Sequence, residues 1–146
     1  MKKLVCSYDI NQEDNQPETI QEAVAIVLLP KILKDKKDSL FLKIVDENED
    51  IDKVISETTT PRIVGVGKSL DPIYIAIEGD IIGGPLKTHS LLEVPIILVA
   101  AYYAFNIQYP SSCNVYPFLE AILFDNNHII KNKVVVHKVI TCLKGK

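Results

Sequence analysis

The chain has 146 residues and a formal net charge of −3, so no global positive field would draw it to nucleic acid. Apolar residues make up 47% of the chain and charged residues 24%, which excludes a wholly disordered protein and fits one domain with a buried core. The three cysteines, Cys6, Cys113 and Cys142, are too few for a disulfide framework and form no CxxC pair for zinc. We therefore predict a reducing compartment, the cytoplasm or the nucleus.

Neither a secretory signal nor a membrane span is indicated. No sustained apolar run follows Lys2 and Lys3, as a secretory signal would require. The longest uncharged apolar run, residues 94–105, is shorter than the roughly 20 residues that a spanning helix needs. We expect no association with a membrane.

The first predicted element is a helix that begins at Pro17, after a flexible N-terminus at residues 1–16. Proline suits the first position of a helix, and the acidic Glu18 suits its positive end. From residue 20 onward, apolar side chains recur at helical spacing. Pro30 should end or kink this helix, and a charged loop should follow at residues 34–38.

Three apolar runs rich in β-branched residues predict strands at residues 40–45, 63–67 and 73–77. The sequence Glu78-Gly79-Asp80 predicts a tight turn into residues 81–82, which would complete a hairpin. Polar and apolar residues do not alternate regularly along these runs, so we expect both faces of the sheet to be covered.

The second half of the chain predicts a helical hairpin. Ser90 and Glu93 have the spacing of a capping box at the start of a long apolar helix. This helix should break at Tyr109-Pro110, and a second short amphipathic helix should follow it, up to residue 124. Residues 126–146 form a basic tail in which residues 134–140 predict a strand.

These elements predict a single α+β domain at residues 17–125. Its N-terminal helix and C-terminal helical hairpin should pack against a small, mainly antiparallel sheet. The predicted core residues are Val24, Val27, Leu42, Ile44, Val64, Val66, Ile75, Ile77, Leu98, Ala101, Phe105, Phe118 and Leu119. Because Phe105 belongs to this set, Phe105→Ala should unfold the domain.

Residues 65–69, GVGKS, match the end of a phosphate-binding loop, in which backbone amides and a lysine cradle phosphates. The full pattern needs glycine at position 62, where the chain has Arg62, and a helix after the serine, where Pro72 and a predicted strand follow. A turn at the end of a strand is the favoured interpretation. A nucleotide-binding or enzymatic domain that uses Gly67, Lys68 and Ser69 is the alternative function.

Residues 46–57 match a calcium-binding loop in several ligand positions. The candidate ligands are Asp46, Asn48, Asp50, Asp52 and Glu57. The sixth position requires glycine for a sharp turn but carries the β-branched Ile51, which resists a positive φ. We favour a solvated acidic loop, and we predict no metal site.

Nucleophilic catalysis would need a cysteine or serine beside a base. Cys113 lies near the predicted start of the second helix, where the helix dipole could lower the pKa of its thiol, but a half-buried cysteine at the helix cap is the favoured interpretation. His89, His128 and His137 are all distant from it in the sequence, so no pair is indicated. We predict no catalytic residue and no cofactor site.

The C-terminal tail is basic. It carries Lys131, Lys133, Lys138, Lys144 and Lys146, without arginines or interleaved aromatic residues that would read bases. A solubilising charged tail is the favoured interpretation, and nucleic acid is not the expected partner. Weak nucleic-acid association through these lysines is a second alternative function.

Four short motifs carry a resemblance to known proteins: PRIV at residues 61–64, IAIEG at 75–79, YAFNIQYP at 103–110 and FLEAIL at 118–123. With them, residues 40–124 resemble the C-terminal region of a large group of uncharacterised animal proteins, abundant in fishes. Some of these are described as sterile-alpha-motif domain-containing proteins, and many look spread by mobile elements. The chain lacks the N-terminal adaptor domain of the longer relatives and adds the tail after Asp125.

The resemblance implies no catalytic residue, because its motifs are aromatic and apolar packing positions. The sequence also combines a well-formed apolar core with no constellation of titratable groups. We therefore predict a non-enzymatic protein-interaction or regulatory module with a protein partner, related to a longer, mobile-element-related protein.

Overall fold

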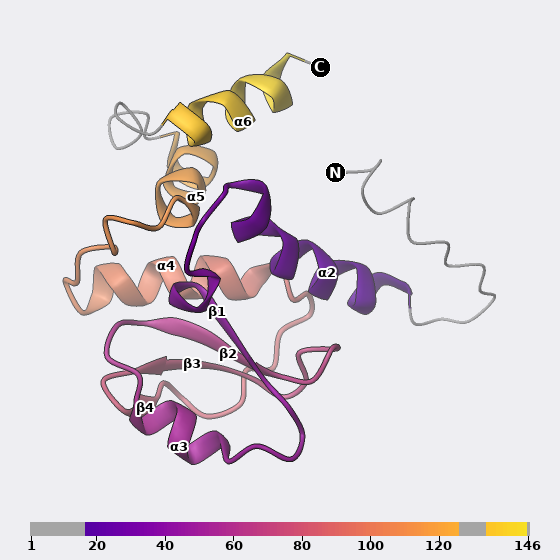
Figure 1. Cartoon of the computed structure of the whole chain (residues 1–146), viewed down its shortest axis with the longest axis vertical. Helices are drawn as coiled ribbons and strands as arrows, with labels where there is room; N and C mark the ends of the chain where they lie inside the picture. Colours follow the sequence, from indigo (N-terminus) through magenta and orange to yellow (C-terminus); the bar gives the residue numbers. More distant parts are fainter. Residues whose placement is uncertain (1–16, 126–133, 146) are drawn as a thin grey trace.

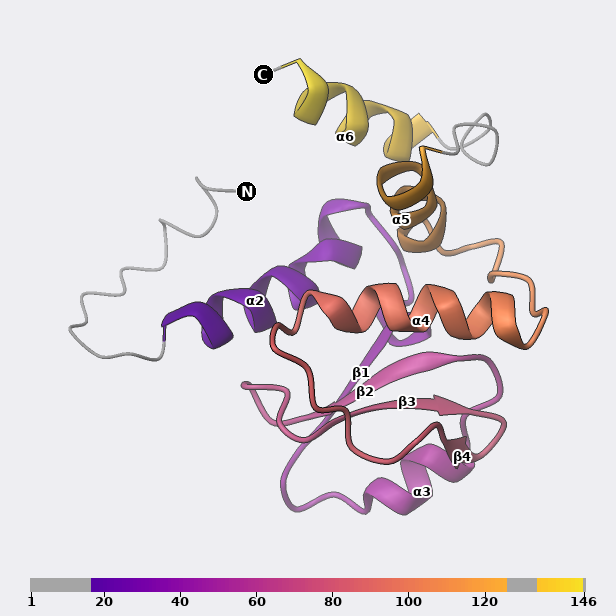
Figure 2. The same cartoon turned by 180° about the vertical axis from the view of Figure 1, so that it is seen from behind.

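A four-stranded mixed sheet lies between one short helix and a layer of longer helices, as Figure 1 shows from one side and Figure 2 from the other. This computed structural model describes residues 17–125 and 134–145. The helices are α2 (Pro17–Ile32), α3 (Ile51–Ser56), α4 (Glu93–Ala104), α5 (Val115–Phe124) and α6 (Val134–Lys144), with the 3-10 helix η1 (Asp38–Leu40). The strands are β1 (Leu42–Val45), β2 (Arg62–Val66), β3 (Ile73–Ile77) and β4 (Asp80–Ile81). The predicted α+β class is confirmed.

The strands lie in the order β1-β2-β3-β4. β1 and β2 pair in parallel because α3 carries the chain back between them, whereas β2–β3 and β3–β4 are antiparallel. The predicted strands and the hairpin at residues 78–82 are confirmed, except that η1 delays the first strand to Leu42. The sheet therefore presents two faces that must both be covered.

Both faces of the sheet are buried, as predicted. Ile63 and Ile75 point toward α4 and belong to the main apolar core. Their neighbours Val64 and Ala76 point to the opposite face, where they pack with Ile55 of α3. Successive strand residues face opposite sides, so continuous apolar runs in β2 and β3 serve two separate apolar clusters.

The predicted N-terminal helix is confirmed, but Pro30 does not end it. The last turn contains Pro30, and α2 continues to Ile32. The helix ends where Lys34 adopts a left-handed conformation, with φ of 58°. The amide of Lys34 then bonds the carbonyl of Lys31 at 3.1 Å, and that of Asp35 bonds the carbonyl of Pro30 at 2.8 Å, a Schellman ending.

The predicted capping box at the start of α4 is wrong. Leu92 occupies the cap position, and its side chain makes no capping hydrogen bond. Ser90 instead donates to a carboxylate oxygen of Glu22 in α2 at 2.8 Å, and the amide of Leu91 donates to the other oxygen at 2.9 Å. A carboxylate from another helix thus fills the role that the sequence assigned to Glu93.

The first helix of the hairpin ends earlier than predicted, several residues before the break expected at residues 109–110. Asn106 adopts a φ of 54°, which asparagine tolerates better than most residues. Its amide bonds the carbonyl of Tyr103 at 3.1 Å, and the amide of Ile107 bonds that of Tyr102 at 2.9 Å. This second Schellman ending leaves residues 106–114 as a loop that crosses to α5.

The strand predicted at residues 134–140 is wrong, because this segment lies in helix α6. Its β-branched residues favour a strand by propensity, but Val136 and Ile140, four residues apart, are both buried in the main core. Apolar burial at helical spacing against α5 therefore overrides the local preference. The predicted flexible N-terminus at residues 1–16 lies outside the described residues.

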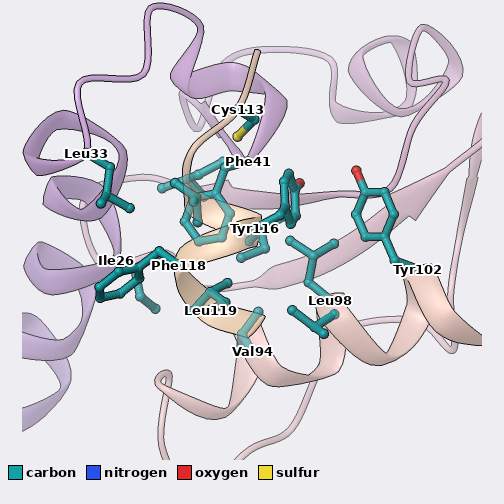
Figure 3. Packing of buried hydrophobic residues seen from close by; sticks show 14 of the residues in the cluster. Ile26, Leu33, Phe41, Val94, Leu98, Tyr102, Cys113, Tyr116, Phe118 and Leu119 are labelled. Carbon is teal, nitrogen blue, oxygen red and sulfur yellow. The ribbon is translucent and has the colours of Figure 1, made fainter. Parts of the chain in front are cut away.

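Most of the predicted core is confirmed, and Figure 3 shows part of it between α2, α4 and α5. The buried members are Leu42, Val64, Ile75, Ile77, Leu98, Ala101, Phe118 and Leu119, and the partly buried ones are Val24, Val27 and Val66. The prediction is wrong for Ile44, on an edge strand, and for Phe105, whose side chain is 54% exposed. Phe105 follows the last residue of α4 and points away from the core, so it cannot be a packing centre.

Candidate functional site

The C-terminal end of α4, the following loop and α5 enclose a cleft of about 420 Å³. Volumes of this order are typical of sites for small ligands or single side chains. The lining residues are Tyr102, Tyr103, Asn106, Ile107, Gln108, Tyr109, Pro110, Ser111, Cys113, Pro117 and Glu120. We refer to it below as the tyrosine cleft.

Glu120 is the acidic residue of the tyrosine cleft. Its side chain is 2% exposed, although it sits in the middle of the amphipathic helix α5. The hydroxyl groups of Tyr103 and Tyr109 both donate hydrogen bonds to its Oε1, that of Tyr109 at 2.7 Å. Two hydroxyl donors from the neighbouring segment therefore hold the Glu120 side chain in the wall of the cleft.

Three tyrosine rings form the wall behind Glu120. Tyr109 stacks on Tyr116 with ring centroids 4.9 Å apart, and Tyr102 packs edge-on against both, at 4.9 and 4.8 Å. Figure 3 shows Tyr102 and Tyr116 projecting from α4 and α5 toward each other. Their hydroxyl groups are fixed by backbone carbonyls: Tyr102 donates to Pro61 at 2.9 Å and Tyr116 to Leu40 at 2.7 Å. Backbone carbonyls thus anchor two of the three rings.

The environment keeps the two tyrosine hydroxyl groups of the cleft protonated. The pKa of Tyr103 is raised, chiefly by its hydrogen bond to Glu120. The pKa of Tyr109 is raised strongly, first by burial and then by the same carboxylate. Both hydroxyl groups therefore stay protonated near neutral pH and donate to Glu120.

Asp35 binds the start of α5, on the side of the loop that holds Cys113. Its Oδ1 accepts the amide of Asn114 at 2.6 Å, and its Oδ2 accepts the amide of Val115 and the Cys113 thiol, each at 3.2 Å. In return, the side chain of Asn114 donates to the carbonyl of Leu33 at 2.9 Å. The end of α2 and the start of α5 therefore cap each other and fix one rim of the cleft.

Cys113 is not an activated nucleophile. Burial, followed by the negative charge of Asp35, raises the pKa of its thiol to about 12. The favoured interpretation of the sequence, a cysteine at the helix cap, fits this position; the helix dipole does not lower the pKa, because the carboxylate that caps the helix lies against the sulfur. The thiol is protonated at neutral pH and lines the cleft as a small neutral group.

The cleft is rich in hydrogen-bond acceptors. Among the described residues, its lining includes Glu120, three tyrosines and the side-chain amides of Asn106 and Gln108, but no lysine, arginine or histidine. This lining favours a ligand that forms hydrogen bonds with it.

The phosphate-loop candidate is a strand-to-strand turn. Gly67 has a φ of 69°, Lys68 and Ser69 are exposed, and the amide of Gly67 bonds the carbonyl of Val45 at 2.9 Å. The chain then enters β3 rather than a helix. The helix N-terminus that positions phosphates in such loops is therefore missing from this turn.

The calcium-loop candidate is interrupted by a helix. Asp50 caps α3 by accepting the amides of Asp52 and Lys53, at 3.1 and 3.4 Å. Ile51, in the position that a calcium loop reserves for glycine, is the first helical residue. No group of three metal-ligating side chains occurs within residues 17–125 and 134–145.

The remaining sequence candidates lie apart from the tyrosine cleft. His89 is exposed before α4, His137 belongs to α6, and His128 lies outside the described residues. Of the tail lysines, Lys138 is exposed on α6 and Lys144 belongs to the same helix, whereas Lys131, Lys133 and Lys146 lie outside the described residues.

Sequence reasoning missed Asp35 and Glu120. In the sequence, Asp35 is one of several charged residues in a loop. Its hydrogen-bond partners, Cys113 and Asn114, lie far along the chain, so no local pattern indicates them. Glu120 carried a usable signal: it is the single charged residue within the apolar sequence VYPFLEAILF of α5. A lone carboxylate on the buried part of such a helix needs polar partners, and tyrosines were available in the preceding segment.

Comparison with known proteins does not assign this chain to a family. No family model matches it, and no curated protein or solved structure is significantly similar to it. The resemblance of residues 40–124 to the fish-abundant animal proteins therefore stays a prediction. Within the described part of the chain, the helices are too short or too polar to cross a membrane.

Proposed function

We propose that the chain is a non-enzymatic protein-interaction module whose recognition surface is formed by α4 and α5. One observation carries the proposal: large apolar side chains of α4 and α5 stay exposed, among them Tyr103, which lines the tyrosine cleft. Ile96 and Tyr103, seven residues apart on α4, are 45% and 59% exposed, and Phe124 of α5 is 55% exposed. The rings of Tyr103 and Phe124 contact each other edge-on, 6.1 Å between centroids.

This α4–α5 surface, defined by Ile96, Tyr103 and Phe124, has the character of a protein contact. Exposed aromatic side chains beside a concave site are typical of the centre of interfaces, where they supply much of the binding energy. Contiguous apolar exposure is otherwise a liability for a globular domain. A partner that covers these side chains would remove that liability.

The nucleophilic groups of the cleft, within the part of the chain that the structure describes, are not activated, and this supports a non-enzymatic role. Cys113 is held as a neutral thiol, and the tyrosines of the cleft have raised pKa values. These groups orient and bind; they are not poised to transfer protons near neutral pH. The proposal also includes a cytoplasmic or nuclear location, which is supported by the free thiols of Cys113 and Cys142. It includes the origin from a mobile-element-related protein as well, which is supported by the motifs of residues 40–124.

A quantitative pull-down with the tagged chain tests the proposal. The variant Ile96→Ser should lose a stoichiometric protein partner that the unchanged chain captures, with at least a tenfold drop in recovery. Leu143→Ser is the matched control, because Leu143 is equally exposed, at 45%, but lies on α6. Thermal unfolding must show that both variants are folded.

Two results would contradict the proposed surface. One is a partner that is captured equally by the unchanged chain and by Ile96→Ser. The other is a partner that is lost with Leu143→Ser and kept with Ile96→Ser, which would move the interface to α6.

A further inference from the structure

The outer edge of β1 carries backbone groups that β2 does not satisfy. In the part of the chain that the structure describes, β1 is the strand at one edge of the sheet (Figure 1). The carbonyl of Phe41 accepts the amide of Ile63 at 2.9 Å, and the carbonyl of Val45 accepts the amide that follows β2, also at 2.9 Å. Bonds of a strand to one neighbour come from alternate residues, so Leu42 and Ile44 direct their N–H and C=O groups away from β2.

These outward groups form an open template for another strand. Within residues 17–125 and 134–145, no hydrogen bond reaches the N–H or C=O groups of Leu42 and Ile44. A strand edge of this kind pairs readily with an extended chain unless a proline, a bulge or a charged side chain opposes it. β1 contains no proline, and its one charged residue is Lys43. Pairing at this edge therefore depends on what a partner places opposite Lys43.

The two faces of β1 differ in chemistry. Ile44 lies on the same face as the buried Leu42, but it is 40% exposed because no further strand covers it among the described residues. Lys43 lies on the opposite face and lines a pocket of about 600 Å³ between the sheet and α3. An added strand would thus meet an apolar side chain on one face and a basic one, beside a pocket, on the other.

The sheet contributes two basic side chains to this pocket. Arg62 of β2 lies on the same face as Lys43, both are partly buried, and the Nε of Arg62 is buried without a hydrogen-bond partner. Among the described residues, neither side chain forms an ion pair. The other charged lining residues are exposed and carry both signs: Glu49, Asp50, Lys53 and Glu57. Water and salt screen exposed charges more than partly buried ones, so the basic pair favours an acidic group.

We propose that the outer edge of β1 binds an extended peptide segment in antiparallel pairing, with an acidic side chain opposite Lys43 and apolar side chains beside Ile44. The residue opposite Lys43 forms a pair without hydrogen bonds, in which the Cα atoms lie only about 4.5 Å apart, and opposite charges in such pairs attract. A second copy of β1 fits less well, because it brings its own Lys43 to the same face. The surface is separate from the α4–α5 surface, so the inference goes beyond the proposed function.

Titration of the full chain, followed by nuclear magnetic resonance, tests the proposal. The probe is the peptide acetyl-Thr-Val-Glu-Val-Thr-amide. We expect saturable shifts of the amides of residues 42–45, and at least tenfold slower hydrogen exchange of the Leu42 and Ile44 amides in the complex. Slow exchange of both amides in the free chain would show that the edge is already paired, and this would overturn the proposal.

Modified peptides test the backbone pairing and the acidic side chain separately. Methylation of the two valine amides, which face β1 in the proposed pairing, should weaken binding at least tenfold. Methylation of the two threonine amides, which face away, is the matched control and should leave the affinity unchanged. Glutamine in place of glutamate should weaken binding at least threefold. Equal affinity of the valine-methylated peptide contradicts the pairing, and equal affinity of the glutamine peptide contradicts the acidic group.

Two variants of the chain locate the binding at β1. Ile44→Pro removes an outward N–H at an edge, where proline is tolerated, so the affinity should fall at least tenfold, whereas Ile44→Val should bind like the unchanged chain. Lys43→Glu should reverse the preference, so that a peptide with lysine in place of glutamate binds at least threefold tighter. It keeps the test valid if the proline variant fails to fold. Lys68→Glu, the same charge change at an exposed position, should leave the preference unchanged.

The proposal is overturned if the probe does not bind at millimolar concentration, or if Ile44→Pro is folded and binds it like the unchanged chain. A dimer that Ile44→Pro dissociates would also overturn it, because the occupant would then be a second copy. Failure of this inference is separable from failure of the proposed function. If no peptide binds while Ile96→Ser still abolishes partner capture, the α4–α5 surface stands; if the peptide binds while Ile96→Ser changes nothing, only the β1 edge stands.

Discussion

Asp35, which follows α2, and Glu120 of α5 are two acidic side chains that each accept several hydrogen bonds, and the comparison between them separates a carboxylate that joins two helices from one that lies in the wall of a cleft. Asp35 uses both oxygens, which accept two backbone amides and a thiol at the start of the helix. Glu120 receives two tyrosine hydroxyl groups on one oxygen, within the cleft. Both are acceptors of several hydrogen bonds, but their donors differ in mobility.

Backbone amides at a helix start cannot move without unwinding the helix, so Asp35 is committed to holding α2 and α5 together. Tyrosine hydroxyl groups sit at the ends of side chains, and Tyr103 is largely exposed. These hydroxyl groups can rotate while the backbone stays in place. The nature of the donors therefore separates the carboxylate that joins α2 to α5 from the carboxylate that lies in the cleft.

The largest expected effect concerns Phe118, which lies on α5 between the two carboxylate sites and is 9% exposed. Phe118→Ala should lower the free energy of unfolding by about 3–5 kcal/mol, because it removes a large side chain from the core. Phe105→Ala should cost less than about 1 kcal/mol, because that ring is more than half exposed. Urea unfolding measures both, and equal losses would contradict the assignment of Phe105 to the surface.

Isosteric changes of the two carboxylates sharpen the comparison. Asp35→Asn should lower the free energy of unfolding by about 1–3 kcal/mol, because one oxygen becomes an amide that cannot accept a backbone N–H. Glu120→Gln should cost less than about 1 kcal/mol, because a single amide oxygen can still accept both hydroxyl groups. The exposed Glu47→Gln serves as control in the same urea titrations. A greater loss for Glu120→Gln would make Glu120 the structural residue of the two.

Alkaline pH should weaken the Asp35 site through Cys113. The folded chain raises the pKa of this thiol from 9.0 to about 12, so below pH 9 the thiol is protonated in both the folded and the unfolded chain. As the pH rises above 9 the unfolded chain loses this proton first, and the stability contributed by the thiol is lost progressively up to about pH 12. Stability measured across this range should decline less steeply in Cys113→Ser, whose hydroxyl group does not ionise there. An identical slope in the two proteins would show that the thiol makes no contribution.

The smallest effect is expected far from both carboxylates, at the Gly67 turn. Lys68→Ala should change the free energy of unfolding by less than about 0.5 kcal/mol, because the side chain is exposed. Mg-ATP should not shift the melting temperature of either protein. A rise in melting temperature with Mg-ATP that disappears in Lys68→Ala would instead support nucleotide binding through Gly67, Lys68 and Ser69.

The sequence by itself determined the local elements. Pro17 marks the first helix, β-branched runs mark β1 to β3, and Glu78-Gly79-Asp80 marks the hairpin, because each depends on the conformational preferences of neighbouring residues. Continuous apolar character in the strands also indicated a sheet covered on both faces. These features need no knowledge of distant segments.

Only the tertiary structure decided how the helices are capped and where the cleft lies. Glu22 reaches the start of α4, Asp35 reaches the start of α5, and the tyrosines from two segments meet at Glu120, in contacts that join residues far apart in the chain. Likewise, α6 is a helix because Val136 and Ile140 find an apolar surface on which to pack, against the preference of its β-branched residues. Local preferences are worth fractions of a kcal/mol per residue, whereas burying apolar side chains and satisfying buried carboxylates are worth several, so tertiary contacts prevail where the two disagree.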